Sequence, residues 1–348
     1  MQKPHVRLRE AIWEITDQCG QNCSYCGSKS IINSTPIDEE DIKAIIDNIA
    51  EYPPEEINIS GGNPLLIYAD IHRYLVEKLH NTVCKIILNP FNIACADPIT
   101  RVETLNLYAA VGLSVNTMDE LSCATDLLTK SNCAPCLNGK TTIITNFNLA
   151  NIWNFKQIED FVIKHNLGWQ IQYTMYKGDN SLAVYQNEDA NNYLLDCIKK
   201  STAKIIRADN FNDGACSAGA FSIGILANGD VIPCLSMRSW EDDSKSYGNL
   251  LEASLKDIWE YSFSAFRCRE FKCCKDVTGC VEEIKHKPNL IMELGGVIKG
   301  WPKQQYEQHE YKPITMAYGI NTGQVFVYGV FNPWESSSVI SDLVKKDK

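Results

Sequence analysis

A repeated alternation of strand-like and helix-like segments constrains the fold of this chain more than any other feature. Short apolar runs, each bounded by polar, Gly or Pro residues, predict strands at 11–16, 56–60, 85–89, 113–116, 141–146 and 170–175. Six strand–helix units in succession predict an α/β fold, with a parallel sheet covered by helices. The spacing alone permits either a barrel or an open, doubly wound sheet.

Composition limits the classes of protein to which the chain can belong. Its 348 residues are 45% hydrophobic, enough for one large core and a smaller second unit. No run approaches the roughly 20 apolar residues that cross a bilayer, and there is no apolar targeting segment, so the 15 cysteines are expected to be reduced in a cytoplasmic protein. The net charge of −10 argues against a broad nucleic-acid surface.

Three closely spaced cysteines follow the first predicted strand. Cys19, Cys23 and Cys26 form a C-x3-C-x2-C pattern that lets one loop supply three thiolates to one iron–sulfur cluster. Such clusters normally take four protein ligands, so one iron would remain open to a small chelating molecule.

Two alternatives exist for this trio, a structural zinc site and a set of reduced core thiols. Structural zinc requires a fourth Cys or His nearby. No histidine lies between His5 and His72, and the next cysteine is Cys84. The cluster is therefore the favoured interpretation.

A glycine-rich motif comes directly after the second predicted strand. Its residues are Ser60, Gly61, Gly62, Asn63 and Pro64. Paired glycines let the backbone approach a ligand without interference from a Cβ atom. Strand, cysteine loop, helix and glycine motif, in this order, resemble the radical S-adenosylmethionine (SAM) superfamily.

That resemblance implies a partial (β/α)6 barrel in which the trio binds a [4Fe–4S] cluster and SAM chelates the open iron. Tyr25 would then pack near the adenine of SAM, and Gly61, Gly62, Asn63 and Pro64 would hold its amino group. The family usually has Glu where this chain has Asn63, so an amide oxygen and backbone carbonyls would replace part of a salt bridge.

Amide side chains occupy positions at which buried parallel strands are usually apolar. They are Asn89, Asn116, Asn146, Asn148, Gln170 and Gln172. In parallel α/β folds, ligands bind at the carboxyl ends of the strands. The resemblance places the ribose and carboxylate of SAM near the fourth to sixth strands, which makes Asn116 and Asn146 the leading candidates. Capping of the following loops is an equally good interpretation of either residue.

A second cysteine-rich region begins at Cys216. Residues 221–226 and 231–234 predict a hairpin around Asn228 and Gly229, followed by a helix over 255–266 and a cluster of four cysteines. This layout resembles the SPASM extension of radical SAM enzymes, or its shorter form, twitch. The resemblance implies one auxiliary [4Fe–4S] cluster held by Cys216, Cys234, Cys274 and Cys280, with Cys273 and Cys268 as substitutes. Zinc at the same thiolates is the alternative.

Other segments complete the domain organisation. A final hairpin is expected over 314–320 and 324–331. The expected domains are therefore a barrel over 1–208, an auxiliary-cluster domain over 209–285 and a C-terminal extension over 286–348. Cys133 and Cys136 are predicted to be a reduced loop pair. Cys84, Cys95, Cys123 and Cys197 are predicted to be small buried hydrophobes.

The resemblance implies an enzyme that reductively cleaves SAM to a 5′-deoxyadenosyl radical, which abstracts hydrogen from a substrate carbon. The outcome would be oxidation, dehydrogenation or crosslinking of a small molecule or a peptide, with flavodoxin or ferredoxin as electron donor. Only about ten residues precede the first strand, which tilts the expectation towards a small substrate or a leaderless peptide. No catalytic side chain is assigned. The alternative function is an iron–sulfur or zinc scaffold without radical turnover.

Overall fold

A single curved sheet organises the part of the chain that the structure describes. The computed structural model describes residues 7–21, 23, 26, 28, 37–173, 187–208, 218–235 and 246–263, with the backbone of four short strands at 269–270, 285–286, 314–319 and 324–329. The strands of the main sheet are β1 (Glu10–Thr16), β2 (Glu56–Gly61), β3 (Val83–Leu88), β4 (Ala110–Ser114), β5 (Thr141–Phe147), β6 (Gly168–Tyr173), β7 (Lys204–Ala208), β8 (Ser222–Ile225) and β9 (Val231–Ile232).

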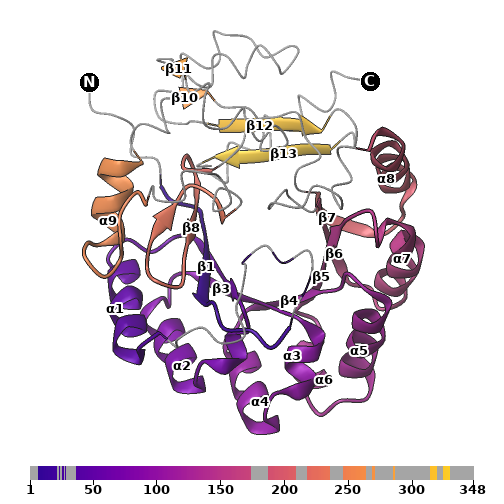
Figure 1. Ribbon diagram of the computed structural model, residues 1–348, viewed down its shortest axis with the longest axis horizontal. Coiled ribbons are helices and arrows are strands. Elements are labelled where there is room, and N and C mark those ends of the chain that lie inside the picture. Colours follow the sequence, from indigo (N-terminus) through magenta and orange to yellow (C-terminus); the bar gives the residue numbers. More distant parts are fainter. Residues whose placement is uncertain are drawn as a thin grey trace.

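The order of these strands decides between the two architectures that the spacing permits. Across the sheet it is β7-β6-β5-β4-β3-β2-β1-β8-β9, and every neighbouring pair from β7 to β8 is parallel. In a doubly wound sheet the order would reverse. Here it does not reverse between β1 and β7, and the sheet curves into an open arc with the helices outside it (Figure 1). The predicted partial barrel is confirmed.

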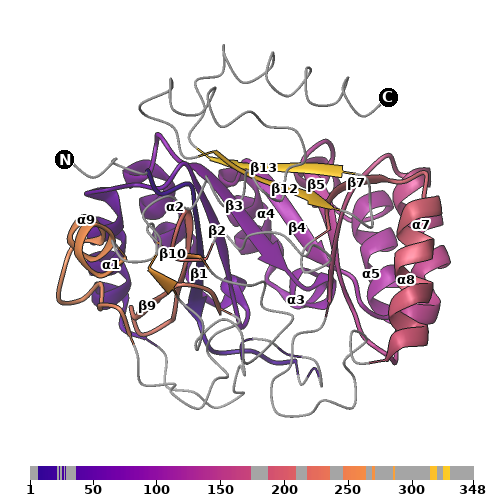
Figure 2. The ribbon, with the colours of Figure 1, turned by 90° about the horizontal axis from the view of Figure 1, so that it is seen from above.

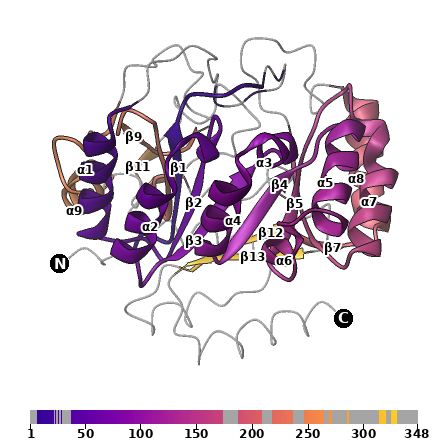
Figure 3. The ribbon, with the colours of Figure 1, turned by 90° about the horizontal axis from the view of Figure 1, so that it is seen from below.

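Helices cover the outer, convex face of the sheet. They are α1 (Glu39–Ala50), α2 (Ala69–Lys78), α3 (Pro90–Cys95), α4 (Pro98–Leu107), α5 (Met118–Thr129), α6 (Ala134–Leu137), α7 (Phe155–Lys164), α8 (Glu188–Lys200) and α9 (Leu255–Asp257), with 3-10 turns η1 (Pro64–Leu66) and η2 (Ile152–Asn154) and a π-helical turn η6 (Ile258–Ser262) after α9. Side-chain caps such as Asp38 and Thr117 accept backbone N–H groups at helix starts. Figures 2 and 3 show these helices side by side around the outside of the sheet.

The two faces of the sheet differ sharply in polarity. Side chains on the outer face, such as Trp13, Ile59, Ile86 and Val111, are fully buried against the helices. Those on the inner face are mostly polar or small. They are Glu10, Ile12 and Glu14 of β1, Glu56, Asn58 and Ser60 of β2, Lys85 and Ile87 of β3, Gly112 and Ser114 of β4, Thr142, Ile144 and Asn146 of β5, and Gln170 and Gln172 of β6. The apolar core therefore lies between sheet and helices.

The amino-terminal end of the inner face holds a group of paired charges. Lys85 forms an ion pair with Glu56 at 2.5 Å, and the Asn58 amide donates to carboxylate oxygens of both Glu10 and Glu56 at 3.0 and 3.1 Å. These side chains satisfy one another. The predicted site residues lie at or just beyond the other ends of the strands, the carboxyl ends.

Several predicted elements agree with the structure and some differ. The hairpin around Gly229 is confirmed as β8–β9, with a positive φ of 86° at that glycine. The C-terminal hairpin is confirmed as β12 (Ile314–Gly319) and β13 (Gln324–Gly329), and a further short pair joins β10 (Arg269–Glu270) to β11 (Lys285–His286). β4 begins three residues earlier than predicted and ends at Ser114, so Asn116 lies beyond it. α8 is the helix of the sixth predicted strand–helix unit, for which no range was given, and β7 was not predicted.

The second cysteine-rich region contributes to the same sheet as the first. β8 pairs with β1 in parallel, with Glu10 opposite Ser222 and Trp13 opposite Ile225. Leu255, Ile258 and Trp259 belong to the main hydrophobic core. The predicted boundary at residue 208 therefore falls between strands of one sheet.

Candidate functional site at the carboxyl ends of the strands

The loop that carries the first three cysteines is anchored to the turn after β2. We call residues 17–28 the cysteine loop and residues 61–64 the glycine turn. The backbone N–H of Gly62 donates to the Thr16 carbonyl, and that of Asn63 donates to the Gln18 carbonyl, each at 2.7 Å. Backbone hydrogen bonds thus join the carboxyl ends of β1 and β2 immediately before Cys19.

Gly61 and Gly62 are required by this close approach. A Cβ atom on Gly62 would lie 2.0 Å from the Gln18 carbonyl oxygen, and one on Gly61 would lie 2.3 Å from that of Thr16. Gly61 also has a φ of 116°, which side-chain-bearing residues rarely adopt. From the sequence alone, the paired glycines are expected to admit a ligand. The approach that the structure shows is to the chain's own backbone.

The three cysteines of the loop are partly exposed, and none forms a disulfide within the described residues. The Gln21 backbone N–H donates to Cys19 Sγ at 3.4 Å, and the Cys26 N–H donates to the Cys23 carbonyl at 3.0 Å. The Gln21 side chain donates to Asn92 Oδ1 on α3 at 3.4 Å. The loop therefore reaches across the carboxyl ends of β1, β2 and β3.

The arrangement of these thiols bears on the zinc alternative. Within the described residues, no three Cys, His, Asp or Glu side chains come close enough to share one metal ion. Ligands of a tetrahedral zinc ion lie about 3.8 Å apart, because each Zn–S bond is about 2.3 Å. A cuboidal cluster spreads three thiolates over three irons. The preference for a cluster over zinc therefore rests on the sequence, in which no fourth Cys or His lies near the trio.

Asn63 serves as the cap of η1. Its Oδ1 accepts the Leu65 backbone N–H at 3.1 Å, and Pro64 occupies the first position of the turn. One lone pair of the amide oxygen is thus already engaged. At Asn63, a ligand ammonium group would meet the remaining lone pair of the amide oxygen in place of a carboxylate.

A buried network of amides and one carboxylate joins the ends of β3, β4 and β5. Glu120, only 3% exposed, accepts from Asn89 Nδ2 at 2.6 Å and from the backbone N–H groups of Asn116 and Thr117 at 2.6 and 3.0 Å. Asn116 Oδ1 accepts the Asn146 backbone N–H at 2.7 Å. Asn116 therefore bridges two strands, in addition to any ligand contact.

Asn146 has a different environment from Asn116. Its side-chain oxygen Oδ1 is buried and has no hydrogen-bond partner within the described part of the chain. Its register places it on the inner face, opposite Gln172 of β6. A buried carbonyl-type oxygen without a donor is costly, so this position suits a ligand that supplies an O–H or N–H group.

Glu120, Asn92 and Gln21 were not identified from the sequence. Glu120 had a recognisable signal, because Thr117-x-x-Glu120 is a capping box, which the structure confirms at the start of α5. The contact between Gln21 and Asn92 joins residues 71 positions apart and has no local signature.

The remaining predicted site residues are only partly described. Cys234 is partly exposed near the end of the β8–β9 hairpin and forms no disulfide with another described cysteine. Tyr25, Cys216, Cys274 and Cys280 lie outside the described residues, as do the substitutes Cys268 and Cys273. The cluster site of the second region therefore stays a prediction.

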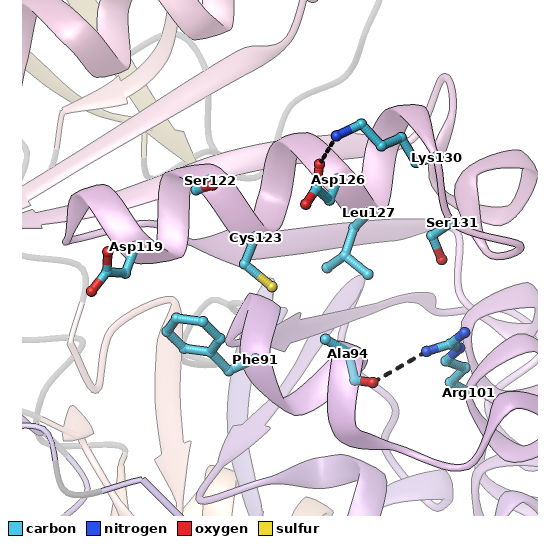
Figure 4. A pocket seen from close by; sticks show the side chains of 10 residues that line it. All are labelled: Phe91, Ala94, Arg101, Asp119, Ser122, Cys123, Asp126, Leu127, Lys130 and Ser131. Carbon is cyan, nitrogen blue, oxygen red and sulfur yellow. Dashed lines mark hydrogen bonds and ion pairs between the residues drawn. The ribbon is translucent and has the colours of Figure 1, made fainter.

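A separate groove of about 680 Å³ lies on the helical side of the molecule, between α3 and α5. Figure 4 shows Cys123 pointing across it towards α3, beside Phe91, while Lys130 pairs with Asp126. None of the described residues of the cysteine loop or the glycine turn lines this groove.

Comparison with known families identifies both cysteine-rich regions. Residues 13–134 match the Radical SAM superfamily, and residues 216–281 match the SPASM iron–sulfur cluster-binding domain. The resemblance found in the sequence is therefore confirmed. A radical SAM domain implies a [4Fe–4S] cluster and SAM, and a SPASM domain implies auxiliary iron–sulfur binding. A comparison with curated proteins found no match.

Solved structures share the fold at low sequence identity. SuiB from Streptococcus suis bound to S-adenosylmethionine aligns with a TM-score of 0.57 and 17% identity, covering 75% of this chain and 68% of that chain. SuiB bound to the precursor peptide SuiA aligns with a TM-score of 0.55 and 16% identity, covering 83% of this chain and 74% of that chain. anSMEcpe with bound AdoMet and the Cp18Cys peptide aligns with a TM-score of 0.56 and 15% identity, covering 82% of this chain and 94% of that chain. Within the described residues, no helix is long and apolar enough to span a membrane.

Proposed function

The chain carries a radical SAM domain followed by a SPASM iron–sulfur domain, and from this premise we propose that it is an enzyme that cleaves SAM reductively and removes hydrogen from a carbon atom of a peptide. The observation that carries the proposal is the cysteine loop, whose three partly exposed thiols are held across the carboxyl ends of β1, β2 and β3. Ligands of parallel α/β folds bind at these ends.

Each part of the site has a distinct task under this proposal. Cys19, Cys23 and Cys26 hold the [4Fe–4S] cluster, and the glycine turn receives the amino group of SAM. Asn146 Oδ1 accepts a hydroxyl or amide hydrogen from the bound ligand. When bound, the cluster and SAM supply one-electron reduction and hydrogen-atom abstraction.

The substrate class rests on the inner face of the sheet and on the related structures. Amide, hydroxyl and small side chains line that face at the carboxyl ends of β4 to β6, which suits a polar substrate that forms hydrogen bonds. Two structural neighbours are bound to peptides, SuiB to its precursor peptide SuiA and anSMEcpe to the Cp18Cys peptide. A small molecule is the alternative substrate.

The second region is proposed to hold one auxiliary cluster on Cys216, Cys234, Cys274 and Cys280. A flavodoxin or ferredoxin would supply the electron, and the enzyme would act in the cytoplasm. The auxiliary cluster would either receive an electron from the substrate, completing a two-electron oxidation, or anchor the substrate.

Anaerobic reconstitution with iron and sulfide, followed by SAM and dithionite, tests the proposal. We expect 5′-deoxyadenosine by mass spectrometry, and iron and sulfide equivalent to two clusters. Combined Cys19→Ala, Cys23→Ala and Cys26→Ala substitutions should abolish 5′-deoxyadenosine and remove half of the iron.

Cys95→Ala is the matched control, because Cys95 is an exposed thiol outside both predicted ligand sets. It should leave the iron content and the product unchanged. A wild-type protein that binds iron but forms no 5′-deoxyadenosine would support the scaffold alternative. Zinc without iron in both regions would refute the proposal entirely.

A further inference from the structure

One fully buried histidine contacts the glycine turn from helix α2. His72, on α2, is 0% exposed. Its Nε2 lies 3.0 Å from the Pro64 carbonyl oxygen, and its Nδ1 lies 2.5 Å from the Tyr108 hydroxyl. Both ring nitrogens are therefore engaged, one with the turn itself and one with the end of α4.

The partners determine where the proton of this imidazole lies. A carbonyl oxygen only accepts hydrogen bonds, so Nε2 must carry the hydrogen and donate it to Pro64. Nδ1 is then the acceptor for the Tyr108 hydroxyl. Burial lowers the pKa of His72 to about 4, so the ring is neutral at pH 7, as this pattern requires.

Tyr108 is itself held in place. It is 2% exposed and follows the last residue of α4. Its backbone carbonyl accepts from Lys140 Nζ at 3.0 Å, and the same ammonium donates to the Leu105 carbonyl at 2.6 Å. A chain of hydrogen bonds thus runs from Lys140 through Tyr108 and His72 to Pro64.

We propose that His72 is a positioning residue for SAM, which fixes the Pro64 carbonyl so that the glycine turn presents its backbone to the cofactor. The inference rests on the function proposed above. The turn is held on its other side by the Thr16 and Gln18 carbonyls, through the N–H groups of Gly62 and Asn63.

This chain has a particular need for such a contact. Asn63 provides no carboxylate, and its oxygen already caps η1. Recognition of the SAM ammonium group therefore depends on backbone carbonyls, which bind well only if the turn is held in one geometry.

The hydrogen-bond assignment can be tested without any cofactor. In cofactor-free protein labelled with [15N]histidine, one ring should show the neutral Nε2–H tautomer, unchanged between pH 7 and pH 6, and this signal should disappear in His72→Gln. Tyr108→Phe should shift the Nδ1 resonance and retain the tautomer. An Nδ1–H tautomer, or a His72 ring that titrates near pH 6.5, would overturn the assignment.

The positioning role is tested by SAM affinity in reconstituted protein, measured by equilibrium dialysis. His72→Leu should raise the Kd for SAM about five- to tenfold, the loss expected for one hydrogen bond. His72→Gln keeps an N–H donor at the corresponding position and should restore most of the affinity. Both variants should retain the wild-type cluster content.

Leu75→Ala on the same helix is the matched control, since Leu75 is equally buried but has no polar side-chain atom to bond the turn. It should lower the melting temperature and leave the SAM Kd within twofold of wild type. The proposal fails if Leu75→Ala raises the Kd for SAM as much as His72→Leu does, or if His72→Gln does not restore the affinity for SAM. Failure of wild-type protein to bind SAM would instead refute the proposed function, while the tautomer measurement would still stand.

Discussion

The backbone contact at Gly62 is the tightest constraint that a single residue imposes on the site. Gly62→Ala would bring Cβ into the Gln18 carbonyl, and neither backbone segment is free to move aside. We expect unfolding free energy, measured with urea on cofactor-free protein, to fall by at least about 2 kcal/mol. The reconstituted variant should also bind less iron, because the cysteine loop starts at this contact.

Gly20→Ala provides the control for this substitution. Gly20 lies in the same loop, and a Cβ atom there would meet nothing within 4 Å. Its effect should stay within about 0.5 kcal/mol. If both variants lost the same amount of unfolding free energy, the contact between Gly62 and Gln18 would not be what limits stability.

His72 gives folding stability a dependence on pH. Because its pKa is about 4 in the folded state and about 6.5 when unfolded, the unfolded chain binds an extra proton between those values. Stability is therefore retained above pH 6.5 and is lost as the pH falls towards 4. The loss between pH 7 and pH 5 should be about 2 kcal/mol.

Urea unfolding of cofactor-free wild type and His72→Gln at both pH values isolates this contribution, since carboxylates titrate alike in the two proteins. The free-energy difference between wild type and variant should decrease by that amount at pH 5. A difference independent of pH would mean that His72 is not buried in its neutral form.

Among helices and strands, Glu120 ties the start of α5 to the ends of β3 and β4. Glu120→Gln would turn an NH2 group towards at least one of the N–H donors that the carboxylate now accepts. We expect a loss of about 2 kcal/mol in unfolding free energy and faster hydrogen exchange at the Asn116 and Asn146 amides. Glu103→Gln, at an exposed position of α4, should change neither quantity. Unchanged exchange in Glu120→Gln would show that the carboxylate does not hold these strand ends.

For the complete chain, the barrel and the SPASM region share one hydrophobic core. Removing everything after residue 208 would expose the edge of β1 and delete core residues such as Ile225 and Trp259. We expect a 1–208 fragment to aggregate or to melt without a cooperative transition, measured by circular dichroism. A 1–263 fragment keeps β8, β9 and α9 and should melt cooperatively. Cooperative unfolding of the shorter fragment would show that the barrel is an independent unit.

Several features follow from the sequence because they depend on neighbouring residues. Strand positions, the β8–β9 hairpin and the capping box of Thr117 and Glu120 are encoded in short patterns of polarity and turn residues. The spacing of Cys19, Cys23 and Cys26 likewise indicates an iron–sulfur cluster from sequence alone. β7 was missed, since five residues after an unassigned helix give only a weak pattern.

Exposure of individual thiols was predicted less well. Cys84 is buried, as expected, and burial raises its pKa to about 11. Cys133 and Cys136 form no disulfide and are buried, but they are not a loop pair, because Cys133 caps α6 and Cys136 lies within that helix. Cys95 was predicted to be buried and is exposed, while Cys123 and Cys197 are partly exposed. A residue near the end of a helix can face either way, and its sequence neighbours do not decide which.

The sequence by itself determined the strand–helix alternation, the cysteine trio and the domain families, because each depends on residues close together in the chain. Only the tertiary structure decided that the sheet is an open barrel, that β8 joins β1, and that Gly62, Glu120 and His72 hold the carboxyl ends together. The reason is physical. Strand order and the partners of buried polar groups are set by contacts between distant segments, which form only when the strands pair and the helices pack against the sheet.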